Sequence, residues 1–124
     1  MTLLKIYAQL NCTDIQSSSD WYRALFARPN DVDPMDGLME WHQGRNAGFQ
    51  LVFNPHGAGR GSMTLIVSDL AGEHERLMKA GLEVGEILIG DFASFVKLND
   101  PDGNTVVLAE PKGQTKQGST KERG

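Results

Sequence analysis

The stretch LNCTDI at residues 10–15 returns as LIVSDL at residues 65–70, an offset of 55 residues. Each copy joins an apolar strand pattern to a hydroxyl residue, an aspartate and an aliphatic residue. Thr13 or Ser68, with the aspartate that follows it, suits a helix N-cap, because these side chains accept hydrogen bonds from the first turn. The chain is therefore predicted to contain the same supersecondary unit twice.

A helical pattern follows each copy. Apolar residues recur at three- and four-residue spacings over 15–26 and again over 70–78, and Pro29 and Gly81 mark the two stops. Alternating or apolar strand signals, separated by Gly, Asn and Pro, cover 38–42, 48–53, 84–88, 94–98 and 104–109. The glycine-rich segment 54–61 is interpreted as the linker between half-domains at about 3–55 and 62–111. Each half is too small to bury its own sheet, so the prediction is one α+β domain over 1–111, with a curved mixed sheet and both helices outside it.

The composition indicates one soluble domain. The chain has 124 residues, of which 40% are hydrophobic and 23% charged. No apolar run approaches the roughly 18 residues of a membrane span, and the N-terminus lacks the features of a signal peptide, so a cytoplasmic location is expected. A single cysteine, Cys12, excludes an intrachain disulfide and a cysteine-rich zinc site, and its alternation with Leu10 predicts a buried thiol.

The charge is distributed unevenly. Residues 112–124 carry four of the 12 basic residues and one of the 16 acidic residues, which leaves a net charge of −7 on 1–111. An acidic body argues against nucleic acid as a partner and favours a neutral or cationic small ligand. The polar segment 112–124 has no apolar residue to bury and is predicted to be a disordered tail.

The repeat, together with the turn Asp100-Pro-Asp-Gly-Asn104 before the last strand, resembles the vicinal oxygen chelate superfamily. That group includes the glyoxalases, the bleomycin-resistance proteins and the extradiol dioxygenases. The resemblance covers residues 3–111 and implies two tandem βαβββ half-domains whose sheet forms a cup. It also implies a homodimer, which would cover exposed strand edges.

The same resemblance implies where a metal would bind. Members with a metal hold it through His or Gln on the first strand of a half and Glu on its last strand. The matching positions here are Tyr7, Gln50, Ser62 and Val107. Valine cannot donate and serine is a poor ligand, so no metal and no cofactor are predicted. The alternative is a metal-dependent lyase, isomerase or dioxygenase with a non-standard ligand set, for which Glu40 and His42 share a strand face. Because no third partner for such a site is evident, a surface or cup-lining position is the favoured interpretation of this pair.

Strand alternation predicts the lining of the cup. Polar side chains of the first strand point away from the core, and those at 62 and 64 do the same in the second half. The predicted function is the binding of a small organic ligand without a metal, and no catalytic residue is assigned. A cup filled by its own side chains, or a protein-interaction module, stays open as an alternative. The polar contacts are predicted from Tyr7, Gln9, Asn11, Gln50, Ser62 and Thr64, with Trp41 and Phe95 as apolar walls.

Overall fold

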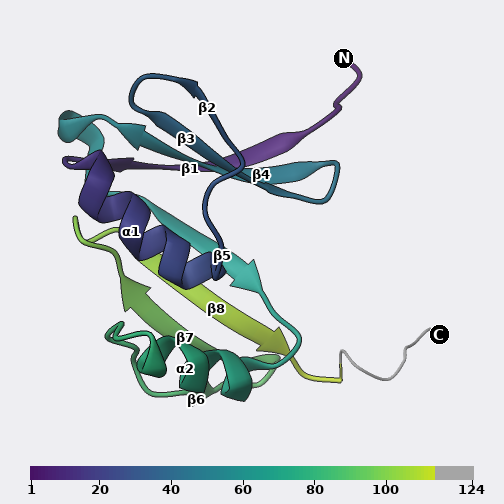
Figure 1. The fold of residues 1–124 in the computed structure, drawn as a ribbon. Coiled ribbons are helices and arrows are strands. Elements are labelled where there is room, and N and C mark those ends of the chain that lie inside the picture. Colours follow the sequence, from purple (N-terminus) through teal and green to yellow (C-terminus); the bar gives the residue numbers. More distant parts are fainter. Residues whose placement is uncertain (114–124) are drawn as a thin grey trace. The chain divides into compact units, whose positions relative to one another are not determined.

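A computed structural model describes residues 1–113 of the protein, so the predicted tail lies outside the described residues from position 114 onward. Within this part, two helices, a short 3-10 turn and eight strands follow one another in the order of two βαβββ halves (Figure 1). The strands form two sheets of four, which confirms the predicted α+β class. The chain divides into two compact units: unit 1 is Met1–Met63 with Asn99–Thr105, and unit 2 is Thr64–Leu98 with the chain from Val106. No helix in residues 1–113 is long and apolar enough to cross a membrane.

The sheet of unit 1 is mixed, as predicted. Its strand order is β1-β4-β3-β2, with β1 parallel to β4 and the other pairs antiparallel. The bounds are β1 Ile6–Cys12, β2 Val32–Met35, β3 Leu38–Gln43 and β4 Ala47–Phe53. The sequence did not predict β2, because this edge strand has four exposed residues, contains Pro34 and breaks register against β3.

Helix α1, Ile15–Phe26, packs its apolar side on this sheet. Asp14 is the N-cap residue and accepts from the backbone N–H groups of Gln16 and Ser17, at 3.0 and 3.4 Å. The rings of Tyr22, Phe26, Trp41 and Phe49 form one aromatic cluster between the helix and the sheet, with centroids 4.6–6.3 Å apart. Cys12 is completely buried, which confirms the predicted core thiol.

The turn at 99–105 belongs to unit 1, although it connects two strands of the other sheet. Buried Asp100 accepts the hydroxyl of Tyr22 at 2.7 Å, and Asn104 donates to Asp100 and to the carbonyl of Asn11 at 2.8 and 2.9 Å. The carboxylate of Asp102 accepts the hydroxyl of Thr13 at 2.6 Å. The motif is therefore specific because its side chains anchor the turn to α1 and to the end of β1.

Unit 2 contains the second helix and most of the second sheet, whose strand order is β5-β8-β7-β6. The bounds are β5 Ser62–Ile66, α2 Leu70–Lys79, β6 Leu88–Ile89, β7 Ala93–Asn99 and β8 Thr105–Pro111. The predicted strand at 84–88 was wrong for all but its last residue, since only Leu88–Ile89 forms a strand there, and Gly85 donates a backbone hydrogen bond to Lys97 of β7 without belonging to a strand. Glu110 of β8 accepts from the N–H of Leu70 at 2.8 Å and so satisfies a free donor in the first turn of α2.

Candidate functional site

Five polar side chains gather on the face of the first sheet opposite helix α1. Glu40 and His42 come from β3, Gln50 from β4, and Tyr7 and Gln9 from β1. The register places Gln50 directly opposite both Gln9 and Glu40. The same register places Gly48 directly opposite both Tyr7 and His42. Because side chains alternate along a strand, these two neighbouring rows share one face, which we call the Glu40 face.

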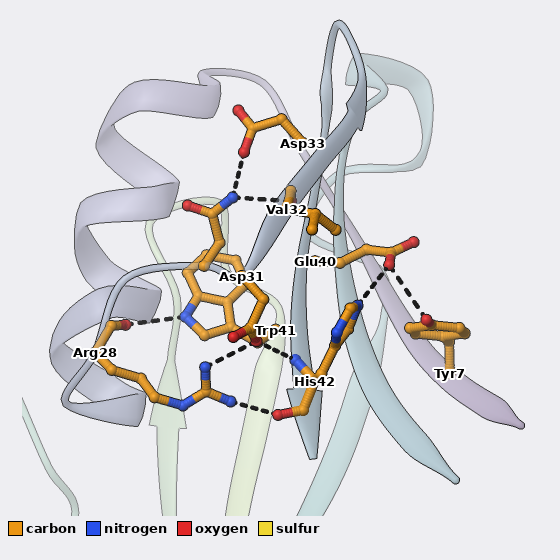
Figure 2. A network of polar contacts seen from close by, with 9 residues as sticks. Tyr7, Arg28, Asp31, Val32, Asp33, Glu40, Trp41 and His42 are labelled. Carbon is orange, nitrogen blue, oxygen red and sulfur yellow. Dashed lines mark hydrogen bonds and ion pairs between the residues drawn. The ribbon is translucent and has the colours of Figure 1, made fainter. Parts of the chain in front are cut away.

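The carboxylate of Glu40 is the centre of the contacts. Its Oε1 accepts the hydroxyl of Tyr7 at 3.2 Å and lies 3.0 Å from Nε2 of His42, as Figure 2 shows. Its Oε2 accepts an amide hydrogen from Gln50 at 2.7 Å, and Gln9 donates in turn to Oε1 of Gln50 at 2.9 Å. Glu40 is only 8% exposed, whereas Gln9 is exposed and the other three residues are half-buried.

These contacts determine the charge of the site. The hydrogen bonds from His42, Gln50 and Tyr7 hold the pKa of Glu40 below its usual value, in spite of its burial. An ionised carboxylate has no hydrogen to donate, so the bond between Glu40 and His42 requires a hydrogen on Nε2 of the imidazole. Nδ1 is then the ring nitrogen left to accept a hydrogen bond while His42 is neutral.

Glycine at position 48 makes room for the Tyr7 ring. A Cβ atom at this position would lie 2.6 Å from Cε1 of Tyr7 and 3.0 Å from the carbonyl oxygen of Trp41. No real Cβ tolerates the first distance, so a side chain here would displace the ring. The ring of Tyr7 therefore crosses β4 at Gly48, and its hydroxyl reaches Glu40 on the strand beyond.

A second set of polar contacts fixes the backbone that carries His42. Asp31 accepts the N–H of His42 at 2.6 Å and a guanidinium hydrogen of Arg28 at 2.8 Å. Arg28 also donates to the carbonyl of His42 (Figure 2). The indole of Trp41 donates to the carbonyl of Arg28 at 3.0 Å. Strand β3 is thus tied to the chain that follows α1, and the hydrogen bond from Arg28 lowers the pKa of Asp31.

The other predicted ligand-binding residues lie elsewhere. Trp41 is 2% exposed in the aromatic cluster under α1, so it cannot serve as the exposed wall that the sequence predicted. Asn11 lies one row beyond Gln9, half-buried, with its amide next to Gly57. Ser62 and Thr64 are exposed on β5, and Phe95 is half-buried on β7. Thr64 and Phe95 belong to unit 2, so their contact with the same ligand stays a prediction.

The positions that the superfamily uses for a metal do not fit one here. Val107 has no donor atom, and the amide oxygen of Gln50 already accepts a hydrogen bond from Gln9. Across residues 1–113, no three His, Cys, Asp or Glu side chains lie close enough together to hold a metal ion. Glu40 forms hydrogen bonds with His42, Tyr7 and Gln50, and the phenol and amide of the last two are weak ligands for a divalent metal.

A separate groove lies in unit 1, between the first half of α1 and the β2–β3 hairpin. Its volume is about 300 Å³, at the lower end for a small-molecule site. None of the predicted ligand-binding residues lines it. The lining consists of Ile15, Gln16, Ser19, Asp33, Met35, Asp36, Gly37, Leu38 and Met39.

Sequence reasoning favoured a surface or cup-lining position for Glu40 and His42, with half of a metal site as the alternative, and missed them as the centre of the polar face. The signal was present in the alternation of β3. Because side chains alternate along β3, Trp41 cannot lie on the same face as Glu40 and His42. An aromatic core position at 41 therefore directs both polar neighbours to the opposite face.

Two βαβββ halves with a polar sheet face are consistent with a glyoxalase fold. The sequence matches the glyoxalase-like domain family over residues 7–109. The chain belongs to that family, which confirms the predicted resemblance to the vicinal oxygen chelate superfamily. No curated protein matches the sequence.

Solved structures agree with this assignment. A glyoxalase/bleomycin resistance protein from Catenulispora acidiphila DSM 44928 is 25% identical, with a TM-score of 0.80 over 86% of this chain and 97% of that one. A bleomycin-binding protein complexed with bleomycin has a TM-score of 0.72 at 19% identity, over 87% and 98% of the two chains. A lactoylglutathione lyase from Agrobacterium tumefaciens has a TM-score of 0.70 at 18% identity, over 85% and 91%. Because their identities are below 25%, the last two matches show only that the fold is shared.

Proposed function

We propose that this chain is a metal-free glyoxalase-like protein that binds a small organic molecule on its Glu40 face. The observation that carries the proposal is the set of four neutral or imidazole side chains around one ionised carboxylate, on an accessible sheet face. Amides, a phenol and an imidazole orient an organic ligand well and hold a divalent metal poorly. Asn11, one row further along β1, extends the polar surface.

Two further observations support the proposal. The positions to which the resemblance assigns the superfamily's metal ligands carry Tyr7, Gln50, Ser62 and Val107, a set without imidazole or carboxylate. A structural neighbour binds bleomycin, which shows that this fold accommodates an organic ligand in at least one protein. These points favour binding over catalysis, because a Lewis-acid mechanism needs ligands that this set does not supply.

The second candidate function is an enzyme of the same superfamily with a non-standard metal site. The observation in its favour is the pair Glu40 and His42, whose carboxylate and imidazole lie 3.0 Å apart. A structural neighbour is a lactoylglutathione lyase, so the fold also serves catalysis in that protein. Activity that a chelator abolishes and a divalent ion restores would favour this candidate.

We further propose a cytoplasmic homodimer that binds neither nucleic acid nor membranes. Leu88, Ile89 and Phe92 are 50%, 78% and 88% exposed in unit 2, where β6 is the edge strand of its sheet. Apolar side chains on an unpaired strand edge are a surface that a second copy could cover. The acidic charge of residues 1–111 argues against binding to phosphates.

Native mass spectrometry of freshly purified protein tests these proposals, because one spectrum records the oligomeric state, bound metal and copurified organic mass. We expect a dimer without metal that carries an added organic mass. Alanine at Tyr7 and Gln50 together should remove that mass while the fold is retained. Alanine at exposed Gln43, on the same sheet but the other face, is the matched control and should leave the mass in place. A stoichiometric divalent metal, or unchanged capture by the double variant, would refute the proposal.

A further inference from the structure

The direction of each hydrogen bond on the Glu40 face indicates what chemistry its ligand must have. Tyr7, Gln50 and His42 all direct hydrogens to the carboxylate of Glu40. Gln9 directs one of its amide hydrogens to Gln50. The donors of the face are therefore used largely within the face, and the carboxylate is where they converge.

Several hydrogen-bond acceptors on the same side chains are not used within the face. Within residues 1–113, no hydrogen bond is donated to the phenol oxygen of Tyr7, to Oε1 of Gln9 or to Nδ1 of His42. Each of these atoms keeps a lone pair when the hydroxyl of Tyr7, the amide of Gln9 and Nε2 of His42 donate their hydrogens within the face. One amide hydrogen on each glutamine is the remaining donor capacity. With the imidazole of His42 neutral, the face thus offers three unused acceptors around a buried negative charge.

We propose that the ligand presents a protonated amine to the Glu40 face. This inference rests on the proposed function and names the class of head group that the site accepts. An ammonium has three hydrogens and no acceptor, which matches three free acceptors around a carboxylate. A ligand carboxylate would meet Glu40 with like charge and would find only the two amide donors.

The chain itself places an ammonium group beside this face. The Nζ atom of Lys5 lies 5.7 Å from the centroid of the Tyr7 ring, within the range of a cation–π contact. The rings of Tyr7 and His42 meet edge to face with centroids 6.4 Å apart, so the aromatic surface next to Glu40 is continuous. Lys5 is exposed and forms no ion pair within residues 1–113, so a ligand ammonium can compete with it for the ring.

Three probes of matched size test the inference: 2-phenylethylamine as the cation, 2-phenylethanol as the neutral compound and 3-phenylpropanoate as the anion. Each is titrated into the full-length ¹⁵N-labelled protein at low salt, and the side-chain amide signals of Gln9 and Gln50 report contact with the face. We expect the amine to bind tightest. In Glu40→Gln the advantage of the amine over the alcohol should fall about tenfold or more, because a charge-assisted contact is lost.

Lys5→Met supplies a second variant that leaves the Glu40 contacts intact. Removal of the competing ammonium should lower the Kd of the amine about two- to threefold and leave the Kd of the alcohol unchanged. If the anion binds as tightly as the amine, or the preference for the amine survives undiminished in Glu40→Gln, the inference is overturned while ligand binding at the face stands. If no probe moves the Gln9 or Gln50 signals, both the inference and the proposed function are overturned.

Discussion

A substitution at Asn104 tests whether side-chain hydrogen bonds anchor the turn at 99–105. The side chain of Asn104 is completely buried and forms three hydrogen bonds. The amide donates to the carbonyl of Asn11 at 2.9 Å and to Asp100 at 2.8 Å, and its oxygen accepts the N–H of Gly61 at 3.0 Å. Asn104→Ala removes all three, which leaves the buried carboxylate of Asp100 short of one donor and the half-buried backbone groups of Asn11 and Gly61 without this partner.

The expected loss follows from these contacts. Each lost hydrogen bond costs about 1 kcal/mol, and a buried group left without a partner costs about 1–3 kcal/mol. We therefore expect Asn104→Ala to lower the free energy of unfolding by about 3–5 kcal/mol. That is a large part of the roughly 5–15 kcal/mol typical of a domain and corresponds to a fall in Tm of roughly 12 °C or more.

Urea unfolding followed by tryptophan fluorescence, with linear extrapolation to water, measures this loss. Asn99→Ala is the matched control, because Asn99 is exposed and its side chain forms no hydrogen bond within residues 1–113. It should change the free energy of unfolding by less than about 0.5 kcal/mol. A loss below about 1 kcal/mol for Asn104→Ala would show that these contacts do not anchor the turn, and the reasoning would fail.

Two further predictions concern Glu40 and Cys12. The pKa of Glu40 is lowered in the fold, so its contacts stabilise the protein above the ordinary value of 4.5 and lose that effect as the pH falls through the folded pKa. The stability gap between wild type and Glu40→Gln should therefore narrow from pH 7 to pH 3 in urea titrations, and a constant gap would contradict the assignment. Burial, followed by the charge of Asp102, raises the pKa of Cys12 to about 11. Its thiol should fail to react with a disulfide reagent at pH 8 and react fully in urea, whereas rapid reaction in the native state would show an open core.

Patterns within short segments could be predicted from the sequence for physical reasons. Both helices begin after the aspartates of the repeat, because an N-cap side chain and a 3.6-residue apolar period are local properties. The burial of Cys12 followed from alternation along a single strand. The prediction for 84–88 failed because an apolar run does not by itself supply a continuous strand partner, and only its last residue lies in a strand.

What the sequence by itself determined, then, is the repeated order of strand, helix and further strands, the starts of both helices and the alternation that buries Cys12. Only the tertiary structure decided which polar residues meet. Tyr7 and Glu40 are 33 residues apart, and Asn11 and Asn104 are 93 apart. Such contacts depend on the register between β1, β4 and β3 and on where a distant turn is anchored. A shift of one residue in that register would exchange the two faces of a strand, and nothing in a local pattern fixes the register between strands so distant in the sequence.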